Sequence, residues 1–147
     1  MTIPHIPVSW GELLDKIAIL RIKTRRLDGP AARADAAREL DLLRRAAAAP
    51  ARVAELIAGL DAVNLRLWRI EDLIRARDAA ADFGPEFVAL ARAVYRENDE
   101  RGRIKQALNR RLGSALVEQK QYSAYQRPTG ATLAGAIPAE PRKTPHD

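Results

Sequence analysis

The chain has 147 residues, of which 47% are hydrophobic, 30% charged and 5% aromatic. These values are typical of one soluble domain that is large enough to bury a core. No apolar run reaches the roughly 18 residues that a transmembrane helix needs, and the N-terminus lacks the basic start of a secretory signal. The absence of cysteine excludes disulfides and thiolate metal sites. We expect a cytoplasmic protein that is not bound to a membrane.

The net charge is +6, from 25 basic and 19 acidic residues. A basic surplus raises the question of nucleic-acid binding. However, the acidic residues are interleaved with the basic ones, and no run of five basic residues occurs. Nucleic acid is therefore the least favoured partner.

The first helix is expected over residues 9–27. Residues that precede Pro4 and Pro7 are pushed out of helical geometry, so the segment before Ser9 should be extended. Ser9 and Glu12 have the spacing of a capping box, which marks a helix start. Apolar residues then recur every three or four positions until Gly29 and the proline after it end the pattern.

A second, alanine-rich helix is expected over residues 30–49, and we expect it to be the most exposed element. Pro50 should end it and open a third helix that continues to about residue 81. The third helix carries two parallel seams. One is apolar and consists of Val53, Leu56, Leu60, Val63, Leu67, Ile70 and Ile74. The other is mostly polar and consists of Ile57, Asp61, Asn64, Trp68, Glu71 and Arg75.

A short turn at residues 82–85 leads into a fourth helix that should reach residue 112. Gly102 would cost about 1 kcal/mol inside a helix, so the sequence leaves open whether the helix is continuous, kinked or broken there. A short turn makes the two long helices antiparallel neighbours. Counting outward from the turn pairs Trp68 with Asn98, and Asn64 with Arg101 or Lys105. The predicted fold is an all-α antiparallel helical bundle built on this hairpin, with the first two helices packed on it.

The composition changes near residue 123, where prolines recur and no periodicity remains. We expect a single helical domain over residues 1–122 and a disordered, Pro/Ala-rich tail over residues 123–147.

The polar seam predicts a binding site between the first, third and fourth helices. Its cations would take a carboxylate or phosphate, its amides would orient the ligand, and its aromatic rings would exclude water. The candidate ligand-binding residues are Lys16, Lys23, Asn64, Trp68, Glu71, Asp72, Arg75, Tyr95, Asn98, Arg101 and Lys105. No catalytic residue, metal site or cofactor is predicted.

A purely structural interpretation accounts for the same residues. Acid-first pairs four residues apart form solvated helix salt bridges, and this spacing occurs in Glu12–Lys16, Glu71–Arg75, Glu97–Arg101 and Asp99–Arg103. Asn64 and Asn98 could satisfy each other across the hairpin.

Three stretches of the chain carry a resemblance to a family. They read VSxGExxDKIxILxIK at residues 8–23, NxxLWxIEDxIR at residues 64–75 and VYxxNDxRxxxKxxxN at residues 94–109. Together they resemble a bacterial family of short all-helical proteins that has no assigned function. The resemblance covers about residues 8–122, leaves the tail outside, and implies a single domain without implying an activity.

Two functions are consistent with these features. The first is a binding or interaction module that recognises an anionic metabolite or a protein partner, and that associates into a homo-oligomer because the second helix is too poor in large apolar residues to cover the hairpin. The alternative is a small enzyme acting on an anionic substrate, similar to chorismate mutases in architecture only. An enzyme or metabolite site would require at least three cations among Lys16, Arg75, Arg101 and Lys105 to converge in one cleft.

Overall fold

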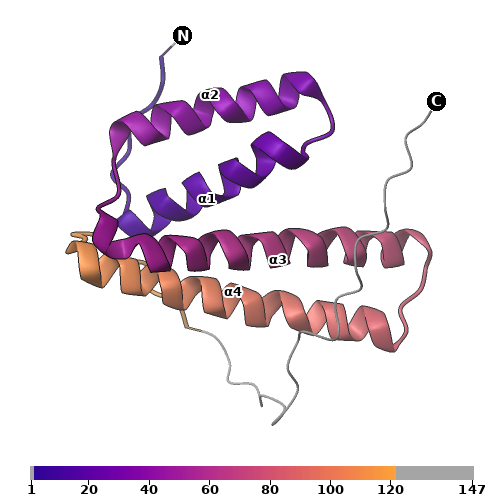
Figure 1. Cartoon of the computed structure of the whole chain (residues 1–147). Helices are drawn as coiled ribbons and strands as arrows, with labels where there is room; N and C mark the ends of the chain where they lie inside the picture. Colours follow the sequence, from indigo (N-terminus) through magenta and orange to yellow (C-terminus); the bar gives the residue numbers. More distant parts are fainter. Residues whose placement is uncertain (1, 122–147) are drawn as a thin grey trace.

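The computed structural model describes residues 2–121, which form four α-helices and no strand (Figure 1). The helices are α1 (Trp10–Arg26), α2 (Pro30–Ala46), α3 (Ala54–Ala79) and α4 (Pro85–Leu112), with a 3₁₀ turn at Ala51–Val53 before α3. The predicted all-α class is confirmed. The expected tail at residues 123–147 lies outside the described residues.

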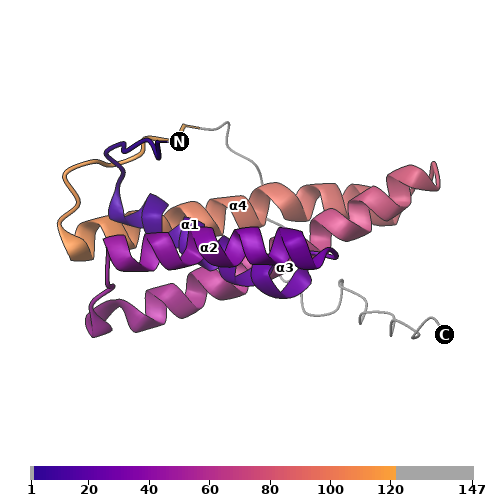
Figure 2. The ribbon, with the colours of Figure 1, turned by 90° about the horizontal axis from the view of Figure 1, so that it is seen from above.

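The helices are arranged in three layers. Helices α3 and α4 form an antiparallel hairpin and have the most extensive contact of any pair. Helix α1 lies on this hairpin and contacts both of its members, and α2 packs along the other side of α1. The predicted hairpin with two helices packed on it is therefore confirmed. The tip of the hairpin extends beyond α1 and α2 (Figure 2).

Two apolar clusters hold the layers together. The larger one joins all four helices, and its most deeply buried members include Ala18, Leu60, Val63 and Leu108. The smaller cluster lies further along the hairpin and centres on Ile70, Leu90 and Ala93. Burial of apolar surface in these clusters is the main stabilising contribution to the fold.

The helix ends follow local chemistry. The Ser9 hydroxyl accepts a hydrogen bond from the Glu12 backbone N–H, as expected for an N-cap. The Glu12 carboxylate does not complete the capping box, since it bonds Lys105 on α4 at 2.7 Å. Pro50 precedes a 3₁₀ turn, so α3 begins at Ala54 and not at Pro50.

Helix α4 is continuous through Gly102, which answers the question that the sequence left open. A penalty of about 1 kcal/mol for one glycine is small beside the packing of a long helix on its neighbours. The helix ends instead at Gly113, whose φ of 61° is left-handed and suits a residue without a side chain. No helix in residues 2–121 has the length and hydropathy to cross a membrane.

Candidate functional site

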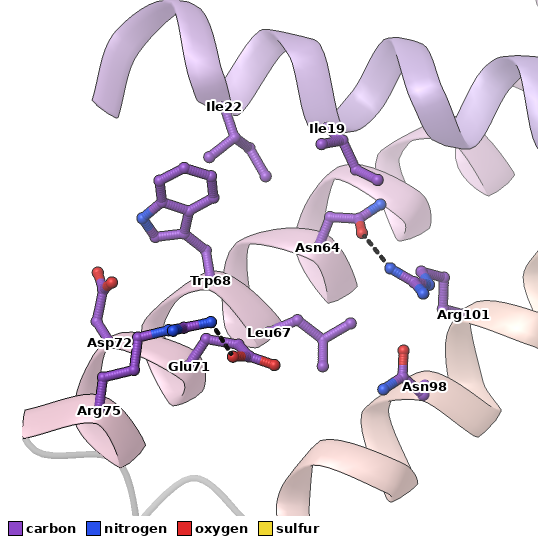
Figure 3. Close-up of a pocket in the computed structure, with 10 residues that line it drawn as sticks. All are labelled: Ile19, Ile22, Asn64, Leu67, Trp68, Glu71, Asp72, Arg75, Asn98 and Arg101. Atoms are coloured by element: carbon purple, nitrogen blue, oxygen red, sulfur yellow. Dashed lines mark hydrogen bonds and ion pairs between the residues drawn. The ribbon is translucent and has the colours of Figure 1, made fainter. Parts of the chain in front are cut away.

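Helix α1 diverges from α3 toward its C-terminal end (Figure 1). A cleft of about 530 Å³ lies there between α1 and the hairpin, and we call it the α1–hairpin cleft (Figure 3). Ten residues from α1, α3 and α4 line it: Ile19, Ile22, Asn64, Leu67, Trp68, Glu71, Asp72, Arg75, Asn98 and Arg101.

One side of the cleft is apolar. Ile19 and Ile22 project from α1 toward Leu67 and Trp68 on α3, and the half-buried indole of Trp68 lies beneath Ile22 (Figure 3). An indole offers a large rigid surface for the flat or aliphatic part of a ligand.

The inner end of the cleft is polar and is fixed by hydrogen bonds. The Asn64 side-chain amide donates to the buried Asp15 carboxylate at 2.8 Å, and its carbonyl oxygen accepts from Arg101 Nη1 at 3.3 Å. Asn98 also lines the cleft (Figure 3), but its amide forms no hydrogen bond with any of residues 2–121. Asn98 therefore has both donors and an acceptor to offer a ligand.

The charges of the cleft balance one another. At the rim, Arg75 pairs with Glu71 at 3.4 Å, and the Arg75 side chain is 78% exposed. Asp72 is exposed as well. Arg101 lies deeper, with its Nε atom 4.0 Å from a carboxylate oxygen of Asp15. Two arginines facing two lining acids give this cleft no preference for anions.

An ionic network built on the buried Lys105 lies behind the cleft and attaches α1 to α4. Its centre is the ammonium group of Lys105, which lies 2.7 Å from Glu12, 3.1 Å from Glu118 and 4.0 Å from Asp15. Burial lowers the pKa of Lys105, but its hydrogen bonds with Glu12 and Glu118 outweigh this effect and raise the pKa above its ordinary value. Lys105 therefore remains charged and binds the two helices together.

The structure brings seven of the eleven predicted site residues into the cleft, namely Asn64, Trp68, Glu71, Asp72, Arg75, Asn98 and Arg101. The other four lie elsewhere. Lys16 faces α2 and pairs with Glu39 at 2.7 Å. Lys105 is held in the network behind the cleft. Lys23 and the exposed Tyr95 do not line the cleft.

Sequence reasoning missed three apolar lining residues, Ile19, Ile22 and Leu67. The isoleucines could have been found from the width of the apolar surface on the first helix, which exceeds what one packing partner needs. It also missed Asp15, although a carboxylate between the apolar Leu14 and Ile17 signals a buried polar partner.

Of the four local salt bridges that the spacing predicted, three do not form. Only Glu71–Arg75 forms. Glu97 is buried and pairs with Arg66 across the hairpin at 2.9 Å, because a buried carboxylate needs a close and well-oriented partner. Arg103 pairs with Glu100.

The other expected local contacts of this polar region are replaced in a similar way. Glu12 and Lys16 have separate partners on α4 and α2. The expected Asn64–Asn98 pair is also replaced, by the bonds of Asn64 to Asp15 and Arg101.

The chemistry of the site gives no sign of a metal centre, since no group of three or more His, Asp or Glu side chains in residues 2–121 is placed to hold a metal ion. Neither the curated proteins nor the solved structures include a match to this sequence. One family model does match, over residues 5–132, and it is described as a family of unknown function. The match extends beyond residue 122, so the expectation that the whole tail lies outside the family is wrong. The chain belongs to this family, DUF6165.

Proposed function

We propose that the chain is a binding module and that its ligand occupies the α1–hairpin cleft. The observation that carries the proposal is the combination, in one cleft, of the Trp68 indole with the Asn98 amide, which forms no hydrogen bond within residues 2–121. Small-molecule sites typically pair apolar walls with a few convergent polar groups.

The chemistry of the lining defines the ligand. A flat or aliphatic body fits between Trp68 and Ile22, and a hydrogen-bonding group on that body would meet Asn98. Asn64 is already held by Asp15 and accepts a hydrogen bond from Arg101, so these two side chains form a rigid inner wall that loses little entropy when a ligand binds.

The enzyme hypothesis ranks below the binding module. It required three of four named cations in one cleft, and only Arg75 and Arg101 line this one. Arg75 lies at the exposed rim, paired with Glu71. Electrostatic stabilisation of a transition state needs charges that are fixed and shielded from water, and Arg75 is neither.

Self-association is retained as a second property of the module. The tip of the hairpin projects beyond α1 and α2 (Figure 2). Phe83, which precedes α4, is 56% exposed, and Val88 in the first turns of α4 is 51% exposed. Apolar side chains at a protruding end favour contact with a second chain. Sedimentation velocity at micromolar concentration should show a species heavier than the monomer, and a monomer alone would refute this part.

The test of the binding proposal is a thermal-shift screen of uncharged aromatic, dicarboxylate and phosphorylated metabolites. A compound at a hundred times its Kd should stabilise the fold by about 2.7 kcal/mol. Trp68 fluorescence should respond to the same compounds in a Trp10→Phe background, because Trp10 and Trp68 are the two tryptophans of the chain.

Two variants on α4 separate binding in the cleft from binding elsewhere. Asn98→Ala removes an amide that supports no hydrogen bond within the described fold, so it should abolish the shift without lowering the melting temperature. Gln106→Ala lies on the same helix outside the cleft and should keep the shift. Equal shifts in both variants, or no shift with any compound, would contradict the proposal.

A further inference from the structure

A second cleft of about 520 Å³ lies between α1 and α3 beside the first one. It is lined by Arg21, Ile22, Arg25, Arg26, Asp61 and Leu65, and we call it the arginine cleft. Arginine outnumbers acid in this lining, in contrast to the balanced charge of the α1–hairpin cleft.

The two clefts are adjacent, because Ile22 lines both of them. Their floors also lie along one stripe of α3, at steps of four, three and four residues from Asp61 through Leu65 and Trp68 to Asp72. At the rise of an α-helix, Asp61 and Trp68 are separated by about 10 Å along the axis. One elongated molecule could therefore contact both clefts at once.

One arginine of the second cleft is already oriented. Arg21 Nη1 donates to both carboxylate oxygens of Asp61, at 3.0 and 3.2 Å. These bonds use one nitrogen of the guanidinium and leave Nε and Nη2 outside the pair. A guanidinium fixed in this way is pre-organised to donate two parallel bonds to an oxyanion.

Arg25 adds a second positive charge to the cleft. Arg25 follows Arg21 by four residues on the same helix face, a spacing at which like charges repel. Arg25 is exposed and forms no ion pair within residues 2–121. Attraction to the C-terminal end of the α1 dipole accounts for bases in the last turn, but it does not account for the placement of Arg21 and Asp61 one turn earlier.

We propose that the arginine cleft binds the phosphate group of a soluble phosphate monoester whose apolar body crosses Ile22 into the α1–hairpin cleft. This inference rests on the proposed function of the α1–hairpin cleft. The sequence predicted that Lys16, Lys23 and Lys105 would bind an anion, but these lysines lie outside the α1–hairpin cleft. In this proposal Arg21 and Arg25 bind the anion instead.

The test uses three probes that divide the ligand into its parts: hexyl phosphate, 1-hexanol and inorganic phosphate. Titration calorimetry should show that hexyl phosphate binds at least roughly ten-fold more tightly than inorganic phosphate, a difference of about 1.4 kcal/mol. Hexyl phosphate should also change the fluorescence of Trp68 in the Trp10→Phe background.

Matched arginine variants locate the phosphate. Arg25→Gln should weaken hexyl phosphate binding about ten-fold. Arg92→Gln should leave it unchanged, because Arg92 is an exposed arginine on α4 outside both clefts. Arg21→Gln should weaken binding as well, and its circular dichroism spectrum checks that the loss of the Asp61 pair leaves the helices intact.

The outcomes separate this inference from the proposed function. The inference is overturned if hexyl phosphate binds no more tightly than inorganic phosphate. It is also overturned if hexyl phosphate binds equally tightly to Arg25→Gln and Arg92→Gln. A Trp68 response to 1-hexanol that the phosphate does not strengthen overturns the inference and leaves the proposed function standing. Phosphate binding with no Trp68 response to either hexyl compound counts against both. If the protein binds phosphatidic-acid vesicles but does not bind hexyl phosphate, the proposal of a soluble phosphate monoester is overturned.

Discussion

The Gly11→Ala variant should lower the free energy of unfolding by about 2 kcal/mol. A methyl group at Gly11 would lie 2.6 Å from the backbone carbonyl oxygen of Lys105 and 3.0 Å from its Cβ atom. Neither atom can rotate away, so α1 must move off α4. Overpacking of this kind costs about 1–3 kcal/mol. The shift would also stretch the buried 2.7 Å bond from the Gly11 N–H to Asn109, and together these effects exceed the gain in helix propensity of at most about 1 kcal/mol.

Gly102→Ala is the matched control, because it makes the same substitution inside α4 where there is space. The nearest atoms to its new methyl group belong to the flexible Lys120 side chain, at 3.9 and 4.0 Å. This variant should raise the free energy of unfolding by about 0.4–1 kcal/mol. Urea denaturation followed by circular dichroism measures both changes. A Gly11→Ala protein as stable as the wild type would refute the close approach of α1 to α4.

Three further predictions concern the polar network and one helix end. Asn64→Ala removes a donor to the buried Asp15 carboxylate and should lower the free energy of unfolding, measured by urea denaturation, by about 1–3 kcal/mol. An unchanged free energy of unfolding would mean that Asp15 is solvated. Burial raises the pKa of Glu118, but the hydrogen bonds and charges of Lys105 and Lys120 together outweigh burial and lower this pKa overall. The Glu118 carboxylate therefore stabilises the fold above its unfolded pKa, and this contribution is lost as the pH falls through the folded value. The stability difference between wild type and Glu118→Gln should therefore shrink in acid, and a difference independent of pH would contradict the pairing. Ala81 has a left-handed φ of 51°, so Ala81→Gly should stabilise the fold by up to about 1 kcal/mol in the same assay, and a loss of stability would contradict that backbone geometry.

The parts of the fold that the sequence predicts are those fixed by counting along the chain. A short turn between two long helices sets their register, because each residue before the turn has one position opposite it after the turn. The predicted neighbours Asn64 and Arg101 accordingly share a hydrogen bond of 3.3 Å. The seam on the third helix was equally informative, since Leu60, Val63 and Ile70 are fully buried.

The parts that could not be predicted depend on how helices cross. Periodicity shows that a helix has an apolar face but not the angle at which it lies on its neighbours. The direction of Lys16 toward α2 depends on this angle, as does the opening of the α1–hairpin cleft beside Ile22. Glu118 lies beyond the end of α4 and returns to Lys105, a contact that no helical spacing contains.

The polar residues between α1 and the α3–α4 hairpin therefore form two groups with different roles. Lys105 and Asp15 are buried charges, and burial of an ion costs several kcal/mol before its partners offset it. An apolar pair of similar size would stabilise the bundle at least as well, so the ionic network is better explained as fixing the orientation of α1. In that orientation, Ile22 lies between the two clefts and lines both of them. Asn64 and Arg101 belong to both groups, because both line the α1–hairpin cleft, while Asn64 donates to Asp15 and Arg101 lies 4.0 Å from the Asp15 carboxylate. A ligand that contacts this inner wall is then coupled to the attachment of α1, and substitutions in the network should change ligand affinity even where they touch no ligand atom.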